Sequence, residues 1–315
     1  MIDINTSKGN DVGRFKRDLI VALFVISCMF GVAITGCTQS PVVPPIEHFH
    51  ANGIGWETPA PWTERPIIND PANFQFAIMS DRTGGRRGDV FAKAVDKVNL
   101  LQPEFVICVG DLIKGYTKDT AVLNSEYDEF DDIANRLDMR FFRVVGNHDI
   151  SNNAMTKLYR ERYGYPYYHF VYKNVLFMVI NTEDPPSKGI SNEQVKYMSK
   201  ALADNPDVRW TFVFMHKPFF VEEAKHPHPG WMKIEDQLKG RPHSVFAGHW
   251  HEYAKYTKHD QSYIRLATTG GGSDLRGIEQ GEFDHIMWVT MTDDGPVIAN
   301  LMVDGIHDEN IKMDE

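Results

Sequence analysis

The sequence has few cysteines, and its main body has no run of basic residues. It carries three cysteines in 315 residues. Cys28 lies in an apolar N-terminal stretch and Cys108 inside a predicted strand, so no plausible pair is left for a structural disulfide. Internal repeats and long low-complexity tracts are also absent. The fold must therefore be held by its hydrophobic core and by any metals that it binds.

The charge of the chain excludes one broad class of function. The formal net charge is −10. Residues 1–36 contain four basic and three acidic residues, so the remainder carries about −11. A binder of the nucleic-acid backbone needs a basic surface, and we expect no such binding here. The length suits one large domain or two small ones, and it allows a full hydrophobic core.

The N-terminus is predicted to be a targeting signal and not part of the fold. Basic residues Arg14, Lys16 and Arg17 precede the apolar stretch Leu19–Ala33, which is typical of a secretory signal peptide spanning residues 1–36. The segment Ile34-Thr35-Gly36-Cys37 resembles the lipobox of bacterial lipoproteins, which implies cleavage before Cys37 and acylation of its sulfur.

An uncleaved transmembrane anchor is the alternative, since Leu19–Cys37 is marginally long enough to span a bilayer. Both interpretations place the body outside the cytoplasm. By the same resemblance, Thr38 favours an exported lipoprotein of the outer membrane or cell surface. Residues 37–70 contain six prolines after Cys37 and are predicted to form an extended tether, followed by one domain over residues 71–315.

Polar residues follow five short apolar runs in the body of the chain. Runs of this kind, rich in Val, Ile and Phe, predict buried strands. The five are Phe74–Met79, Phe105–Val109, Phe141–Val145, Trp210–Met215 and Val245–Ala247. The residues after them are Asp81, Asp111, Gly146-Asn147-His148-Asp149, His216 and Gly248-His249-Trp250-His251. In open α/β sheets, sites form at the carboxyl ends of strands, so the sequence predicts a site there.

Helical patterns alternate with these strands. Val90–Leu101 has apolar residues at helical spacing, Glu126–Leu137 is a weaker helical stretch, and Met155–Tyr163 is a third. Ser191 is predicted to cap a helix that ends near Ala203. Tyr167–Tyr172 with Val175–Asn181 predicts a hairpin, and four further strands follow His251. The pattern alone indicates mixed α/β structure in one domain.

The same residues carry a family resemblance. Gly110-Asp111, Gly146-Asn147-His148-Asp149, the lone His216 and Gly248-His249-Trp250-His251 resemble, in order, the signature blocks of the calcineurin-like metallophosphoesterases. The resemblance implies α/β structure of a particular kind: an αββα sandwich, in which two mixed sheets are flanked by helices. Asp81 and Asp111 alone suggest capping residues, and His216 alone suggests a core histidine, but their joint occurrence in this order outweighs those interpretations.

The resemblance also implies roles for each residue. Asp111 would bridge two divalent metal ions, with Asp81 and His251 on the first ion and with Asn147, His216 and His249 on the second. Mixed oxygen and imidazole ligands suit Mn, Fe or Zn. His148 would either donate a proton to the leaving alcohol or stabilise the phosphoryl oxygens, and Asp149 would accept its other N–H. The implied activity is hydrolysis of a phosphomonoester or phosphodiester, with a water that bridges the metals as nucleophile.

The first block departs from the family pattern. Relatives usually have Asp-x-His there, whereas this chain has Asp81-Arg82-Thr83. Purple acid phosphatases also lack that histidine, but they have a tyrosine three residues after the bridging aspartate, where this chain has Lys114. We therefore expect the first metal site to be the weaker. The alternative function is a metal- or phosphate-binding lipoprotein of low activity.

Arg82 and Arg86 lie in the loop after the first strand and are candidate ligands for the substrate phosphate. A solvated face explains them equally well. Trp231 is either part of an aromatic wall beside the site or a packing residue.

Overall fold

The computed structural model describes residues 70–185, 189–221 and 225–312. The described part contains five α-helices and eleven strands. The helices are α1 (Val90–Leu101), α2 (Thr120–Ala134), α3 (Asn153–Tyr163), α4 (Asn192–Asp204) and α5 (Pro229–Leu238). The strands are β1 (Phe74–Met79), β2 (Phe105–Cys108), β3 (Arg140–Phe142), β4 (Tyr168–Tyr172), β5 (Val175–Val179), β6 (Trp210–Phe214), β7 (His243–Ala247), β8 (Ala254–Lys258), β9 (Gln261–Arg265), β10 (His285–Thr292) and β11 (Gly295–Met302).

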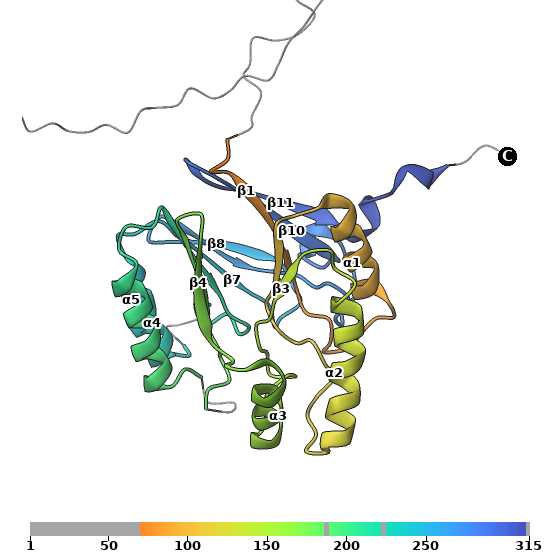
Figure 1. Ribbon diagram of the computed structural model, residues 1–315, viewed down its shortest axis with the longest axis horizontal. Coiled ribbons are helices and arrows are strands. Elements are labelled where there is room, and N and C mark those ends of the chain that lie inside the picture. Colours follow the sequence, from red (N-terminus) through yellow and green to blue (C-terminus); the bar gives the residue numbers. More distant parts are fainter. Residues whose placement is uncertain (1–69, 186–188, 222–224, 313–315) are drawn as a thin grey trace, which may run out of the picture. The chain divides into compact units, whose positions relative to one another are not determined.

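The strands form two mixed sheets. The first has the order β11-β10-β1-β2-β3, in which β1, β2 and β3 are parallel and β10 and β11 are antiparallel additions. The second has the order β4-β5-β6-β7-β9-β8, with β5, β6, β7 and β9 parallel and with an antiparallel strand at each edge. Figure 1 shows α1 and α2 on one side of the paired sheets and α4 and α5 on the other. The predicted αββα sandwich is confirmed.

Aromatic side chains fill the space between the sheets. Phe76 of the first sheet packs against Phe177 and Phe212 of the second, with ring centroids 5.5 and 5.2 Å apart. Such edge-to-face pairs add about 0.5–1.5 kcal/mol each to the burial of apolar area. A second apolar cluster lies under α4 and α5, on the other face of the second sheet. The two layers hold both sheets rigidly, so the loops at their ends start from fixed positions.

Most elements follow the predicted pattern. β1 and α1 have the predicted bounds, and Ser191 caps α4 by accepting a hydrogen bond from the backbone N–H of Gln194 at 3.2 Å. The prediction for α2 was wrong at both ends. The helix starts earlier because the carboxylate of Asp119 caps it by accepting N–H bonds from Ala121 and Val122, and it ends earlier, at Ala134. β3 is also shorter than predicted.

Helix α5 was not predicted. Its signals are Pro229 at the first turn, where proline has no N–H to lose, and Trp231, Ile234 and Leu238 at helical spacing. All three side chains are fully buried. Trp231 is therefore a packing residue and not part of an aromatic wall.

Candidate metal centre

The structure brings the six predicted metal ligands together. Each follows the carboxyl end of a parallel strand: Asp81 follows β1, Asp111 follows β2, Asn147 follows β3, His216 follows β6, and His249 and His251 follow β7. Two groups of potential ligand atoms lie within 4.8 Å of one another. One consists of Asp111, His216 and His249, and the other of Asp81, Asp111 and His251. Asp111 belongs to both groups, which is the position that a bridging ligand requires.

The group around His216 is the more complete. The His216 Nε2 atom lies 3.2 Å from a carboxylate oxygen of Asp111, 3.0 Å from Oδ1 of Asn147 and 3.1 Å from Nδ1 of His249. A carboxylate, an amide oxygen and two imidazoles thus converge on one small volume. This donor set suits a divalent transition metal such as Mn, Fe or Zn.

The group around Asp81 has fewer donors. The Nε2 atom of His251 lies 3.4 Å from Oδ1 of Asp81, and Asp111 completes the set. Thr83 is buried, and its backbone N–H donates to the carbonyl of Asp111 at 3.1 Å. A hydroxyl is a poor metal ligand unless it is deprotonated, so this group offers three strong ligands against four in the other.

Backbone carbonyls orient two of the imidazoles. Nδ1 of His216 lies 2.8 Å from the carbonyl of Val109, and Nδ1 of His251 lies 2.6 Å from the carbonyl of Gly272. A carbonyl oxygen only accepts, so each Nδ1 carries the hydrogen and each Nε2 is directed to the centre. Partners of this kind fix the tautomer of metal-binding histidines.

The electrostatics of the centre favour a cation. Burial alone lowers the pKa of His216, but the carboxylates of Asp111 and Asp81 outweigh it and raise that pKa well above its ordinary value. Burial, assisted by His216, lowers the pKa of His249 to about 4. Two buried carboxylates therefore draw positive charge to this point, while His249 is neutral and has a lone pair to donate.

The backbone bends sharply at three of the ligands. Asp111, His249 and His251 have φ angles of 57°, 75° and 59°, which side chains other than glycine adopt at a cost of about 1–3 kcal/mol each. Bends at both His249 and His251 let the first face Asp111 and the second face Asp81. Strain that clusters on the same residues as the ligands supports a functional role for the loop.

Two glycines leave room for the carboxylates. A Cβ atom on Gly146 would lie 2.6 Å from the backbone nitrogen of Asp111 and 2.9 Å from its Cγ. A Cβ atom on Gly248 would lie 2.8 Å from Val109 and 3.2 Å from Cγ of Asp81. The glycines in the Gly-Asn-His-Asp and Gly-His-x-His blocks are thus needed for close approach to the ligands.

His148 lies beside the centre, but its predicted partner is different. Its Nδ1 atom lies 2.7 Å from the carbonyl of Lys114 and not on Asp149. Asp149 is fully buried, and its carboxylate accepts backbone N–H bonds from Asp111, Leu112 and Gly146 at 2.7–2.9 Å. The prediction that Asp149 accepts an N–H of His148 is therefore wrong. Asp149 instead ties the loop after β2 to the turn after β3.

Tyr116 is a site residue to which no role was assigned from the sequence, where it lies out of register with the tyrosine of purple acid phosphatases. Its hydroxyl accepts a hydrogen bond from Nδ2 of Asn147 at 2.6 Å, and its ring lies edge-on to His148 with centroids 4.6 Å apart. This bond directs Oδ1 of Asn147 toward His216. Tyr116 has a φ of 53°. A bend of that kind, five residues after Asp111, leaves no periodic signal in a sequence.

Arg82 and Arg86 lie near the centre, and the hydrogen bonds and ion pairs of their guanidinium groups are made with Leu112 and Glu129. The guanidinium of Arg82 donates to the carbonyl of Leu112 and to Oε1 of Glu129, both at 2.8 Å. Arg86 forms an ion pair with the same oxygen of Glu129. Both arginines line a cavity of about 410 Å³ that also borders His148.

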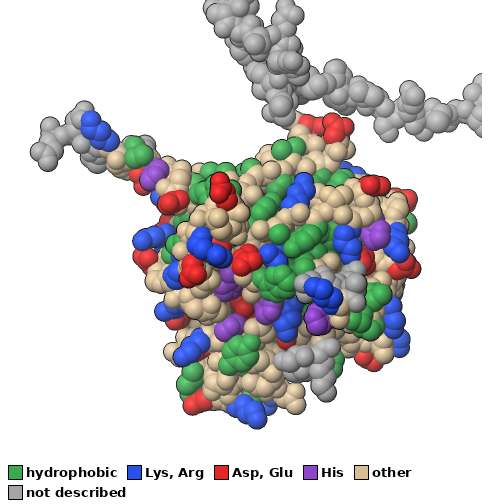
Figure 2. Space-filling view, turned by 180° about the vertical axis from the view of Figure 1, so that it is seen from behind, with side chains coloured by type: hydrophobic (Ala, Val, Ile, Leu, Met, Phe, Trp, Pro, Cys, Tyr) green, Lys and Arg blue, Asp and Glu red, His purple; other side chains and the backbone are tan. Residues whose placement is uncertain are grey.

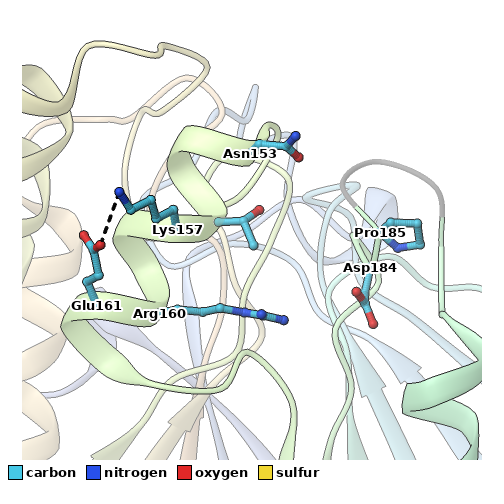
Figure 3. A pocket seen from close by; sticks show the side chains of 7 residues that line it. Asn153, Lys157, Arg160, Glu161, Asp184 and Pro185 are labelled. Atoms are coloured by element: carbon cyan, nitrogen blue, oxygen red, sulfur yellow. Dashed lines mark ion pairs between the residues drawn. The ribbon is translucent and has the colours of Figure 1, made fainter.

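Another cavity lies apart from the predicted ligands. It has a volume of about 480 Å³ and is found between α3 and the turn at Asp184-Pro185 (Figure 3). Lys157 and Glu161, which form an ion pair at 3.7 Å, line it. None of the six predicted ligands does, so this cavity is not the metal centre.

Figure 2 shows histidine side chains gathered near the middle of one face of the molecule, with charged side chains around them.

The predicted signal peptide, the lipobox at Cys37 and nearly all of the Pro-rich tether lie outside the described residues. Within the part of the chain that the structure describes, no helix is long and apolar enough to cross a membrane.

The sequence matches the model of the calcineurin-like phosphoesterase family over residues 67–253. That range contains all six predicted ligands and His148. No curated protein matches the sequence.

Several solved structures are similar in fold. A dimetal phosphatase from Danio rerio is 14% identical, with a TM-score of 0.53, and the match covers 73% of this chain and 99% of that one. The purple acid phosphatase PPD1 of yellow lupin is 13% identical, with a TM-score of 0.57, and covers 77% of this chain and 53% of that one. GAP50, named as the anchor in the inner membrane complex of Plasmodium, is 14% identical, with a TM-score of 0.55, and covers 75% and 86%. At these identities the similarity shows a shared fold.

Proposed function

The chain belongs to the calcineurin-like phosphoesterase family, and we propose that it hydrolyses a phosphomonoester or phosphodiester with two divalent metal ions. The observation that carries the proposal is the shared carboxylate of Asp111, which lies within ligand distance of both groups. When bound, two divalent ions would neutralise the phosphate and lower the pKa of a coordinated water. The family match supports this assignment.

The protein residues have separate tasks in this proposal. Asp111, Asn147, His216 and His249 hold one ion, and Asp81, Asp111 and His251 hold the other. Nδ1 of His148 donates to the carbonyl of Lys114 at 2.7 Å, so in the protonated imidazole Nε2 is the ring nitrogen that gives its proton to the leaving alcohol. Tyr116 keeps the amide of Asn147 turned toward its ion. A general acid of this kind contributes about 10²–10⁴-fold to the rate.

A substrate panel tests the proposal. Chelated protein, reconstituted separately with Mn, Fe and Zn, is assayed on 4-nitrophenyl phosphate and bis(4-nitrophenyl) phosphate. Turnover that depends on added metal supports hydrolysis and shows which ester class is preferred. Absence of turnover with all three metals would refute it.

A binding protein of low activity is the second candidate. Thr83 favours it, because this residue stands where relatives have a metal-binding histidine. GAP50, which is named as an anchor, has a similar fold and supports a role in binding. This candidate requires bound metal without turnover on the same panel, and the two functions are separated by measuring metal content beside activity.

The proposal includes a lipid anchor at Cys37. It rests on the segment Ile34-Thr35-Gly36-Cys37 and its apolar, basic-flanked surroundings. Two acyl chains hold a protein stably on a membrane, since each buried CH₂ contributes about 0.8 kcal/mol. In a bacterial host, Cys37→Ser is expected to accumulate as an unprocessed precursor. Mass spectrometry of the mature wild-type N-terminus decides the matter: an intact residue 1–36 segment would favour the uncleaved anchor.

A further inference from the structure

A cavity of about 410 Å³ adjoins the metal centre on the side of His148. Its walls come from the loop after β1, the loop after β2, helix α2 and the turn after β3. It is lined by Arg82, Thr83, Gly85, Arg86, Lys114, Glu126, Glu129 and His148. Its volume is in the range of about 300–1,000 Å³ that small-molecule sites occupy.

The two arginines in this cavity share one carboxylate. The side chain of Arg82 is 4% exposed and donates to the carbonyl of Leu112 and to Oε1 of Glu129. Arg86, which is 45% exposed, pairs with that same oxygen. One carboxylate thus faces two guanidinium groups, and Arg86, which lines the cavity, pairs with it through Nη1 alone.

The remaining charged residues do not cancel this positive charge. Glu126 accepts the backbone N–H of Gly115 at 2.8 Å and so fastens the loop that carries Lys114. Among the described residues, no carboxylate lies within ion-pair distance of the Lys114 ammonium group, which is exposed. Three cationic side chains therefore face two carboxylates, and both carboxylates already have partners.

The position of His148 sets the direction of the substrate. His148 lines the cavity, and its Nδ1 is held by the carbonyl of Lys114. In the proposed function, on which this step rests, the other ring nitrogen protonates the oxygen of the leaving alcohol. The group attached to that oxygen then enters the cavity.

From this arrangement we infer that the cavity binds the leaving group and selects one that carries a second anionic group, such as a phosphate or a carboxylate. Arg86 and Lys114 contact that anion, and buried Arg82, held by Glu129, fixes the floor of the cavity. The arginines then recognise the leaving group and not the phosphate that reacts.

Two substrates with the same alcohol test the inference. Propane-1,3-diol monophosphate has a neutral leaving group, and propane-1,3-diol bisphosphate has an anionic one. For wild-type protein with Mn, we expect kcat/KM to be about a hundredfold higher for the bisphosphate, which corresponds to one charge-assisted hydrogen bond from each of Arg86 and Lys114. Arg86→Ala and Lys114→Ala should each lower this ratio about tenfold. Glu129→Gln should raise it, because it removes the carboxylate that competes for Arg86.

Arg136→Ala is the matched control. Arg136 is also 45% exposed and pairs with one carboxylate, that of Asp96 on α1. It is not among the residues that line the cavity, so its removal should leave the ratio unchanged.

The outcomes separate this inference from the proposed function. Two results would overturn the cavity assignment alone, provided that 4-nitrophenyl phosphate is hydrolysed. One is a wild-type ratio of kcat/KM near one for the two substrates. The other is a ratio that none of the variants Arg86→Ala, Lys114→Ala and Glu129→Gln changes. If no phosphoester is hydrolysed with any metal, both fail. Thermal melts of the variants verify that each one is folded.

Discussion

Adding one methyl group at Gly248 or Gly146 should displace a metal-binding carboxylate although no ligand residue is replaced. In Gly248→Ala the new Cβ would meet Val109 at 2.8 Å and Cγ of Asp81 at 3.2 Å. In Gly146→Ala it would meet Cγ of Asp111 at 2.9 Å. Carbon atoms pack best at about 3.5–4.0 Å, so neighbours must move by roughly half an ångström or more. Ligand distances in metal sites tolerate only about 0.2 Å.

The expected size of the effect follows from this comparison. Disturbing the residues that position metal ligands lowers metal affinity about 10–100-fold, and overpacking lowers stability by about 1–3 kcal/mol. Because Asp81 belongs to one ligand group and Asp111 to both, Gly248→Ala should weaken one ion and Gly146→Ala should weaken two. Neither glycine has a positive φ, so alanine is tolerated by the backbone and only the lack of space matters.

Calorimetric titration of the chelated protein with Mn, combined with thermal melts, measures both effects. Gly305→Ala is the control, because its Cβ would meet only Met302, at 3.8 Å. We expect the control to bind Mn as the wild type does. Wild-type affinity for both ions in Gly146→Ala would show that Asp111 does not bridge them.

Three further predictions concern single residues. His148→Ala should keep its metal content and lower kcat by about 10²–10⁴-fold, most for poor leaving groups; unchanged kcat in steady-state assays would remove His148 from the mechanism. In the wild type, one metal ion should stay bound through exhaustive dialysis and the other should be lost. Thr83→His should increase the metal affinity of the weaker site. Metal analysis that finds two equally tight ions in the wild type would mean that another residue replaces the missing histidine. Burial lowers the pKa of His285 from about 6.5 to about 4. As pH falls between these two values, His285 binds a proton in the unfolded chain and stays neutral in the folded chain. Between pH 7 and pH 4, the free energy of unfolding of the wild type should therefore fall by about 3 kcal/mol more than that of His285→Gln. Urea denaturation at the two pH values measures this difference. Equal losses in the two proteins would contradict the prediction.

Strand ends were the part of the site that the sequence could predict. Each ligand lies within four residues of the end of an apolar run, and parallel strands bring their carboxyl ends to one edge of a sheet. The burial of β1 and the spacing in α1 are local properties, and so is the cap at Ser191. All three can be recognised from a few consecutive residues.

Contacts between loops were not predictable in the same way. The partner of His148 is a backbone carbonyl, that of Lys114, and any residue type could supply it. Tyr116 reaches Asn147 only because the loop turns through a left-handed conformation. Glu129 meets Arg82 and Arg86 across more than forty residues of sequence, from a helix whose start was predicted wrongly. These features depend on how loops pack on a finished sandwich.

The central claim is that two ions bound through Asp111 make this chain a phosphohydrolase. The most direct test titrates the metal-free protein with Mn and follows binding by calorimetry. Hydrolysis of bis(4-nitrophenyl) phosphate and of 4-nitrophenyl phosphate is measured on the same samples. We predict two unequal binding steps, with hydrolysis that rises as the second, weaker site fills. Full activity in the presence of chelator, or two filled sites without hydrolysis of either ester, would contradict the claim.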